Sequence, residues 1–188
     1  MSKIPEITVH GRFQPPLHIN HWEYVSQGFE RADHVTLLIT NPFQDEAFDA
    51  AASWRNDPEN NPFSYDERAY MFTKFFTAMG IEADRYEIKP FNIKDDAAFA
   101  ALNKEVPNLV NVYSEWSAKK VDAFKDHGLE VIQLDQPKSK PVSGTRIREI
   151  IKASTGNMDV LKQRLIGEGF MPEAVPGLFE VLQRKGQQ

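Results

Sequence analysis

Two hydrophobic patterns, one typical of buried strands and one of amphipathic helices, take turns along the chain. Residues 6–10 alternate with β-branched residues and end at Gly11, which predicts a strand. From Ile19 to Phe29, large apolar residues recur on one face of a predicted helix. The continuous apolar run at 35–40 is typical of a buried parallel strand. The first 40 residues therefore predict a βαβ unit with a right-handed crossover.

The same alternation continues to the C-terminus. Ser64 and Glu67 form a capping-box pattern that opens a predicted helix ending at Gly80. Further strands are predicted at 86–90, 109–114 and 130–134, and helices at 95–106, 117–127, 143–151, 159–169 and 173–185. This order predicts an α/β fold, a doubly wound Rossmann-like parallel sheet of five strands with helices on both faces and C-terminal helices. We expect a single domain over 1–188, with a helical portion from about 143 to 188 packed on it.

Composition narrows the classes of function. The 188 residues are 41% hydrophobic and 26% charged, enough for a sizeable core. The net charge of −5 argues against nucleic acid and membrane surfaces as partners. The absence of cysteine excludes disulfides, thiolate metal ligands and a cysteine nucleophile. No apolar run resembles a signal peptide or a membrane span, so we expect a cytoplasmic protein, with homo-oligomerisation left open.

The turn between the first strand and the first helix, residues 9–21, contains a glycine, an arginine, two prolines and three histidines. A strand-to-helix turn near the start of an α/β domain is where backbone N–H groups and a helix N-terminus hold phosphate. The spacing of His18 and His21 places both rings on one side of the helix entrance. Each ring can donate a hydrogen bond to a phosphate oxygen. We therefore expect this turn to bind the phosphates of a nucleoside triphosphate.

Other interpretations of these residues stay open. One histidine could cap the helix while the other is a surface residue, or the pair could bind zinc with His10 as a third ligand. Gly11 either lets the backbone approach a nucleotide or simply turns the chain. Arg12 could be a solvated charge, and Phe13 is expected in the core.

A second turn, Ser143 to Arg148, opens a later helix with hydroxyl groups and free N–H groups that suit an anion. Arg148 can reach such an anion with a bidentate fork, whereas Arg146 is expected on another face. The alternative is an ordinary N-cap followed by two solvated arginines. If the sheet is doubly wound, both turns lie at its ligand-binding edge and close over one ligand.

Residues 41–63 form a long polar segment, which is typical of a functional or mobile loop. Trp54 lies within it, and Trp116 lies beside another loop at the expected ligand edge. Each tryptophan could stack on a base or ring, or could simply pack against the protein.

Taken together, the two turns resemble the signatures of the nucleotidylyltransferase superfamily, an (H/T)xGH turn after the first strand and an (S/T)xTxxR turn late in the chain. Here they read His18-Ile19-Asn20-His21 and Ser143-Gly144-Thr145-Arg146-Ile147-Arg148. Over nearly the whole chain the sequence is most similar to the archaeal-type nicotinamide-nucleotide adenylyltransferases. The segments that carry this similarity are Gly11-Arg12-Phe13-Gln14-Pro15, Asn61-Pro62-Phe63 to Arg68, Val112-Tyr113-Ser114 and Pro172-Glu173-Ala174-Val175.

The resemblance implies that an acceptor phosphate oxygen attacks the α-phosphate of a nucleoside triphosphate, and that pyrophosphate leaves with Mg²⁺. No covalent enzyme intermediate forms, so alignment and charge stabilisation dominate catalysis. By position, the resemblance implies catalytic roles for His18, His21 and Arg148. It implies nucleotide contacts for Gly11, Arg12, Phe13, Gln14, Asn20, Ser143, Gly144 and Thr145. Phosphates and water supply the Mg²⁺ ligands in such enzymes, so no protein ligand to the metal is assigned.

The chain also departs from the family pattern. Asn20 replaces the usual glycine of the HxGH signature, and one extra residue lies between Gln14 and His18. A long insert precedes Asn61, and Asn60 stands where a basic residue is expected. Where the family has SGNP after its fourth strand, this chain has Ser114-Glu115-Trp116-Ser117. The tryptophan-bearing segment that lines the nicotinamide pocket in the family has no clear match between Phe91 and Leu102, so the triphosphate half of the resemblance is the stronger half.

Three hypotheses follow. The first is an adenylyltransferase of NAD biosynthesis that moves AMP from ATP onto the phosphate of a small molecule, with nicotinamide mononucleotide as the leading acceptor. The second keeps the chemistry and changes the substrates, giving a cytidylyltransferase or an adenylyltransferase for another phosphorylated metabolite or a phosphonate. The third is a non-catalytic nucleotide-binding regulatory domain, which Asn20 and the displaced His18 favour.

Overall fold

A computed structural model describes residues 2–40, 57–112, 115–134, 139–154 and 156–186. The chain divides into two compact units. The first, which we call the sheet unit, comprises Met1–Arg12, Glu23–Pro42 and Ala83–Lys138. The second, the helical unit, comprises Phe13–Trp22, Phe43–Glu82 and Ser139–Gln188. The expectation of one domain over 1–188 stays a prediction.

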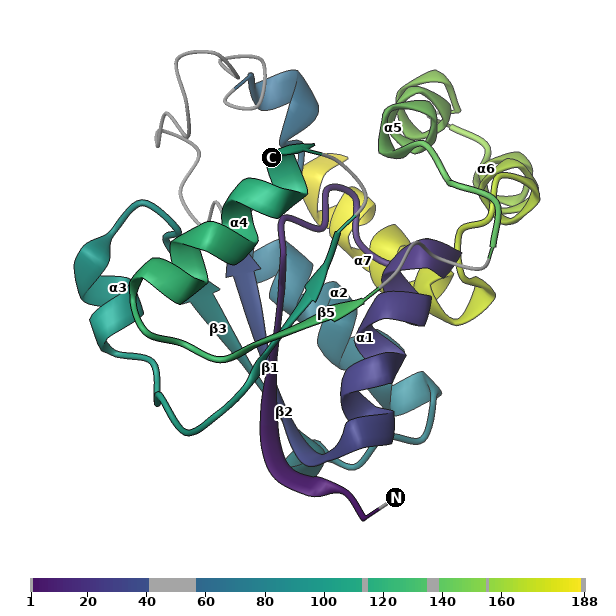
Figure 1. Cartoon of the computed structure of the whole chain (residues 1–188). Coiled ribbons are helices and arrows are strands. Elements are labelled where there is room, and N and C mark those ends of the chain that lie inside the picture. The colour runs from purple at the N-terminus through teal and green to yellow at the C-terminus, as the bar shows by residue number, and fades with distance from the viewer. Residues whose placement is uncertain (1, 41–56, 113–114, 135–138, 155, 187–188) are drawn as a thin grey trace. The chain divides into compact units, whose positions relative to one another are not determined.

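The sheet unit contains a five-stranded parallel sheet in the order β3-β2-β1-β4-β5 (Figure 1). Its strands are β1 (Ile4–Gly11), β2 (Ala32–Thr40), β3 (Tyr86–Phe91), β4 (Asn108–Asn111) and β5 (Val131–Leu134). The strand order reverses direction at β1, because β2 and β3 lie on one side of the first strand and β4 and β5 lie on the other. The structure therefore confirms the predicted doubly wound Rossmann-like fold.

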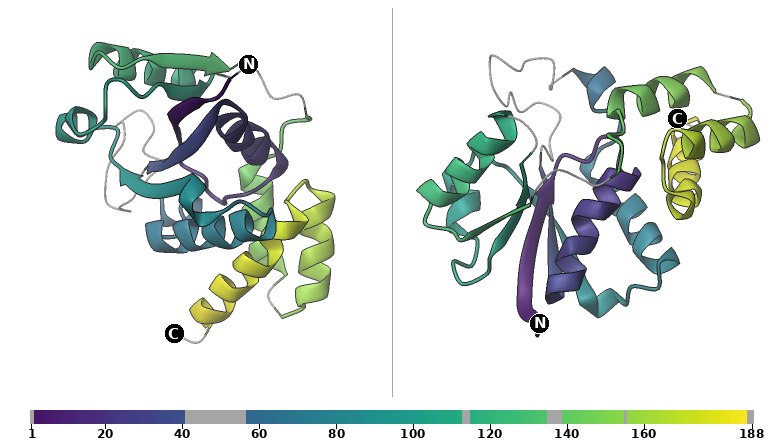
Figure 2. Two further views of the ribbon diagram at one scale, coloured as in Figure 1. Left: turned by 90° about the horizontal axis from the view of Figure 1, so that it is seen from below. Right: turned by 45° about the vertical axis from the view of Figure 1, so that its right-hand side comes forward.

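Helices cover both faces of this sheet, as predicted. On one face, α1 (Ile19–Arg31) packs so closely that a Cβ atom on Gly28 would lie 2.8 Å from Val9 Cγ2. On the other face lie α3 (Asp96–Ala100) and α4 (Glu115–Asp126), and Phe124 of α4 stacks on the His10 ring. Val9 and His10 are neighbours on β1, so their side chains point to opposite faces. Both panels of Figure 2 show the strands between these helices.

The helical unit contains α2 (Tyr65–Ala78), α5 (Gly144–Ala153), α6 (Met158–Gly167) and α7 (Val175–Gly186). The predicted capping box at the start of α2 is confirmed. Ser64 Oγ accepts from the Glu67 backbone N–H at 3.2 Å, and Glu67 Oε2 accepts from the Ser64 N–H at 2.8 Å. The core of this unit is aromatic, with Phe72 of α2 in edge contact with Phe13.

Two predicted elements are shorter than expected. The helix predicted at 95–106 is only α3, Asp96–Ala100. Beyond it, the Asn103 side chain accepts from the Glu105 N–H at 3.0 Å and forms a local turn, and Val106 precedes a proline, which disfavours helix. The strand predicted at 109–114 ends at Asn111, and residues 113–114 lie outside the described part of the chain.

At the C-terminus, the predicted helix at 173–185 begins as a 3₁₀ turn, Pro172–Ala174, before α7. Shorter 3₁₀ turns also occur at Pro58–Asn60 and Ala83–Arg85.

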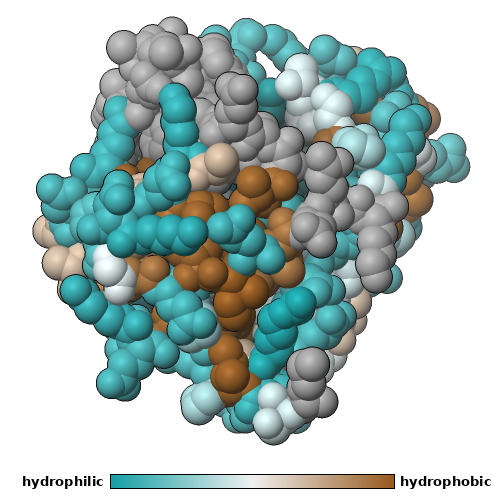
Figure 3. Space-filling model, viewed as in Figure 1, coloured by the Kyte–Doolittle hydropathy of each residue, from teal (hydrophilic) through white to brown (hydrophobic). Residues whose placement is uncertain are grey.

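Hydrophilic residues make up most of the face in Figure 3, around a smaller hydrophobic area. The large hydrophobic residues with the most exposed side chains are Ile19, Val160 and Ile166. Within the described ranges, no helix is both long and apolar enough to cross a membrane.

Candidate active site

The first turn leaves β1 in an unusual backbone conformation. Phe13 and Leu17 have φ angles of 50° and 74°, a left-handed region that non-glycine residues rarely adopt. Such conformations persist only where surrounding contacts hold them, and they concentrate at functional sites. Here the Leu17 carbonyl accepts from the Met171 N–H at 3.0 Å, and the Ile19 N–H donates to the Gly169 carbonyl at 2.8 Å. The segment between α6 and α7 therefore holds the turn in place.

The structure brings His18 and His21 together at the start of α1. Their rings stack with centroids 3.6 Å apart. His21 Nδ1 accepts from the Leu17 backbone N–H at 3.2 Å, so the neutral His21 ring carries its proton on Nε2. This bond assigns His21 a hydrogen-bond donor on the ring edge opposite Leu17.

His18 is 7% exposed, and its Nδ1 atom is buried without a hydrogen-bond partner. Burial lowers the pKa of His18 to about 4, so the ring is neutral near pH 7. A charge on one stacked ring also opposes a charge on the other. The pair can therefore offer N–H donors to an anion, rather than two full positive charges.

The second turn has the predicted helix-opening geometry. Ser143 is the N-cap of α5, and its hydroxyl accepts from the Arg146 N–H at 3.3 Å. Gly144 begins the helix so close to the first turn that a Cβ atom there would lie 3.1 Å from the Gln14 carbonyl oxygen. The two turns, more than 120 residues apart in the sequence, are thus neighbours within the helical unit.

Arg148 joins the two turns. Its Nη1 donates to the Gln14 carbonyl at 2.9 Å, and its Nη2 donates to Asn60 Oδ1 at 2.8 Å and to Thr145 Oγ1 at 3.0 Å. Three of its five N–H groups are engaged in this way. Partial burial lowers the pKa of Arg148, but a guanidinium stays charged at any physiological pH.

Arg146 points elsewhere, as expected. It forms exposed ion pairs with Glu149 at 3.3 Å and with Glu168 at 3.5 Å. The choice of Arg148 over Arg146 is consistent with this placement.

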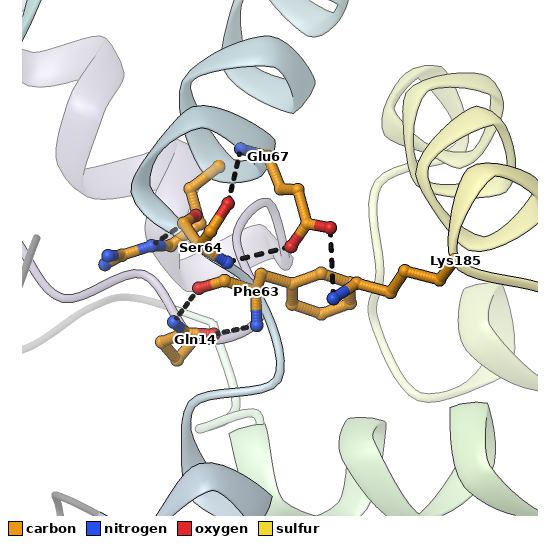
Figure 4. A network of polar contacts seen from close by, with 6 residues as sticks. Gln14, Phe63, Ser64, Glu67 and Lys185 are labelled. Carbon is orange, nitrogen blue, oxygen red and sulfur yellow. Dashed lines mark hydrogen bonds and ion pairs between the residues drawn. The ribbon is translucent and has the colours of Figure 1, made fainter. Parts of the chain in front are cut away.

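The side chain of Gln14 binds the first turn to the backbone of Phe63. Its side-chain amide donates to the Phe63 carbonyl at 2.6 Å and accepts from the Phe63 N–H at 3.3 Å, as Figure 4 shows. Ser64 and Glu67 continue from Phe63 into the cap of α2, and Lys185 of α7 reaches the Glu67 carboxylate at 3.0 Å. The Gln14 side chain is 5% exposed, so this structure gives it a supporting contact, and its direct contact with nucleotide stays a prediction.

Asn20 lies between the two histidines, in the first turn of α1. Its Oδ1 atom accepts from the Val142 N–H at 2.6 Å, and its Nδ2 donates to the Lys140 carbonyl at 3.4 Å and to the Ser139 hydroxyl. The side chain is therefore bonded to the segment that leads into Ser143.

The remaining predicted residues are distributed over both units. Gly11 ends β1 and Arg12 follows it, both in the sheet unit. The Phe13 side chain is core, as expected, because it is 3% exposed and meets the His21 ring edge-on. Trp54 and the side chain of Trp116 lie outside the described residues. In the described part of the chain, no three or more His, Asp or Glu residues are grouped so as to hold a metal ion.

Sequence reasoning missed several residues that build the site. Asn60 accepts from Arg148, and Phe63 pairs with Gln14 through its backbone. The Asn61-Pro62-Phe63 motif had indicated this region in the sequence but had not indicated what its residues do. Gly169 has a φ of 88°, and its carbonyl accepts from the helix that carries the histidines, which no sequence signal indicated.

No family model matches the chain. A phosphonoformate cytidylyltransferase from Streptomyces viridochromogenes is 36% identical over 148 residues, which cover 76% of this chain and 78% of that protein.

Among solved structures, two of a bifunctional NMN adenylyltransferase/ADP ribose pyrophosphatase from Francisella tularensis share the fold. One matches with a TM-score of 0.56 at 18% identity over 81% of this chain, and the other with 0.58 at 16% over 98%. The chain spans 43% and 55% of the length of those two structures, so they support the fold alone. The similarity to the Streptomyces protein goes further, and it shows that this chain belongs to the same nucleotidyltransferase family as that cytidylyltransferase.

Proposed function

We propose that the protein transfers a nucleoside monophosphate from a nucleoside triphosphate onto a phosphorus oxyanion of a small acceptor, with release of pyrophosphate. The observation that carries the proposal is that the turn with the stacked His18–His21 pair and the Arg148 turn contact each other inside one compact unit, through Gln14 and Asn20. A stacked histidine pair at a helix N-terminus and a half-buried guanidinium beside a second helix N-terminus suit a polyphosphate chain.

In the proposed reaction, an acceptor oxygen attacks the α-phosphorus, the new P–O bond forms, and the bond to the β-phosphate oxygen breaks. His21 Nε2–H and His18 donate hydrogen bonds to the α-phosphate oxygens, where negative charge develops. Arg148, Thr145 and Ser143 hold the β- and γ-phosphates and stabilise the leaving pyrophosphate. No residue forms a covalent intermediate, so positioning supplies most of the rate enhancement.

For the substrates, we propose CTP and a small phosphonate as the pair to test first, because the relative with 36% identity is named a phosphonoformate cytidylyltransferase. ATP with nicotinamide mononucleotide is the second candidate. The resemblance of residues 11–15 and 61–68 to the archaeal-type adenylyltransferases favours it.

Mg²⁺ is proposed as part of the triphosphate substrate. Mg²⁺ keeps several waters and binds phosphate oxygens, so water and the triphosphate can supply its ligands. Arg148 would then neutralise phosphate charge that Mg²⁺ leaves uncompensated, while the two histidines would donate hydrogen bonds to the phosphate oxygens.

The decisive experiment incubates the pure protein with each of the four nucleoside triphosphates, Mg²⁺ and a panel of phosphonates and phosphorylated metabolites, and follows pyrophosphate release. Release with CTP and a phosphonate supports the first pair, and release with ATP and nicotinamide mononucleotide supports the second. Triphosphate binding without release for any pair would contradict both, and would leave a non-catalytic nucleotide-binding domain.

A further inference from the structure

Asn20 is the departure from the HxGH signature that the structure explains best. A glycine at this position has no side chain, whereas Asn20 makes three hydrogen bonds to residues 139–142. The strongest by geometry joins the Val142 N–H to Asn20 Oδ1 at 2.6 Å. Val142 is the residue immediately before Ser143, the N-cap of α5.

Two contacts fix Val142 in this place. Asn20 holds its backbone, and Gly169 lies against its side chain, since a Cβ atom on Gly169 would lie 2.8 Å from Val142 Cγ2. The Gly169 carbonyl in turn accepts from Ile19, the residue before Asn20. The entry to the second turn is therefore bonded, directly and through Gly169, to the first turn of α1.

We propose that Asn20 is a positioning residue that fixes the second phosphate-binding turn relative to the histidine pair. This inference rests on the proposed function. Because Oδ1 already accepts from Val142, the amide acts on the nucleotide through Ser143 to Arg148 rather than by touching it. We expect Asn20 to strengthen triphosphate binding, since Arg148 holds the β- and γ-phosphates in the proposed reaction.

Three variants separate the parts of the Asn20 side chain. Asn20→Ala removes all three hydrogen bonds, and Asn20→Gly restores the family residue. Asn20→Asp keeps the acceptor for Val142 and removes the two amide donors. Asn157→Ala is the matched control, because Asn157 also accepts a backbone N–H in the helical unit, from Val160 at 3.1 Å, at the N-cap of α6.

The first measurement is amide hydrogen exchange by NMR. We expect the Val142 and Arg146 amides to exchange about tenfold faster in Asn20→Ala, because one hydrogen bond of ordinary strength is lost. We expect Asn20→Asp to retain protection at Val142, and Asn157→Ala to leave both amides unchanged. Unchanged exchange at Val142 in Asn20→Ala would show that the tether does not hold the turn.

The second measurement is the dissociation constant for the magnesium complexes of CTP and ATP by calorimetry. Asn20→Ala and Asn20→Gly are expected to raise it about tenfold, and Asn157→Ala is expected to leave it unchanged. In an Arg148→Ala background, Asn20→Ala should change it less than in the wild type, because the charged group of the turn that Asn20 positions is gone. Equal effects in both backgrounds would overturn the positioning role. If the wild-type protein binds no triphosphate, the proposed function and the affinity role of Asn20 both fail, while the exchange data still decide whether the tether exists.

Discussion

The sheet unit and the helical unit differ in how their residues are used. In the sheet unit, apolar strands pair in regular register, and the fold follows from their pattern. In the helical unit, the first turn holds two non-glycine residues, Phe13 and Leu17, in left-handed conformations. Backbone strain that fold stability does not require is typical of functional positions. We therefore propose that the chemistry of the helical unit lies in this strained turn.

The two units can also be compared through one buried histidine in each. His10 in the sheet unit is 3% exposed, both of its ring nitrogens lack hydrogen-bond partners, and it stacks on Phe124 at 4.5 Å. Burial, with the nearby charge of Lys120 as a second cause, holds the pKa of His10 well below its usual value. His18 is also buried but stacks on a second histidine at a helix N-terminus. Burial is common to both histidines, so the pairing of two rings is the feature on which the proposed site rests.

The largest expected effect comes from His21→Ala. Removing a donor that stabilises transition-state charge should lower kcat by about 10²–10³. Steady-state pyrophosphate release measures this, with urea unfolding as a check on stability. The matched control is His10→Phe, which replaces an unpaired buried ring by an apolar one and should leave kcat within about twofold. An equal loss of kcat in both variants would mean that the two histidines do not differ in role.

The next effect concerns pH. A buried His18 with a pKa of about 4 takes up its proton in the unfolded state first, near pH 6.5, so the free energy of unfolding should fall as pH drops from 6.5 to 4. His18→Thr, the alternative residue in the family signature, should reduce that fall by about 3 kcal/mol between pH 7 and pH 4. Urea unfolding at both pH values measures the difference.

His127→Gln is the control for this pH effect. The backbone hydrogen bond to Ala123 raises the pKa of His127, so His127 favours the folded state at low pH. Its removal should therefore not reduce the fall. A His18→Thr variant with the full wild-type pH dependence would contradict the burial of His18.

The sequence predicted features that depend on neighbouring residues better than contacts between distant segments. The strands of the sheet and the capping box at Ser64 rest on local rules, and the structure confirms them. The helix predicted at 95–106 is longer than the observed Asp96–Ala100. The prediction followed the alanine-rich sequence and neglected the turn at Asn103 and the proline after Val106. The two turns were recognised from their residue types. Their contact through Gly144 and Gln14, and the tether at Asn20, depend on tertiary packing between segments more than 115 residues apart, which no local pattern encodes.

A smaller effect is expected at Gly169. Its φ of 88° strains any other residue, and a Cβ atom would overlap Val142 Cγ2 at 2.8 Å. Gly169→Ala should lower the free energy of unfolding by about 2–3 kcal/mol. Gly80 has a similar φ of 72°, but a Cβ atom there would have nothing within 4 Å. Gly80→Ala should therefore lower the free energy of unfolding by only about 1 kcal/mol. Chemical denaturation measures both, and equal losses would show that crowding at Val142 contributes nothing.

The smallest effect compares the two arginines of the second turn. Arg148→Lys keeps the charge but cannot bond Gln14, Asn60 and Thr145 at once, so it should lower kcat/KM about tenfold. Arg146→Lys, on an arginine with exposed partners only, should change kcat/KM by less than about twofold. Initial rates at low triphosphate concentration measure both. The planar fork of Arg148 is what matters if only the first variant loses rate, whereas equal rates in the two lysine variants would mean that a positive charge suffices and that the contacts of Arg148 to the first turn do not organise the site.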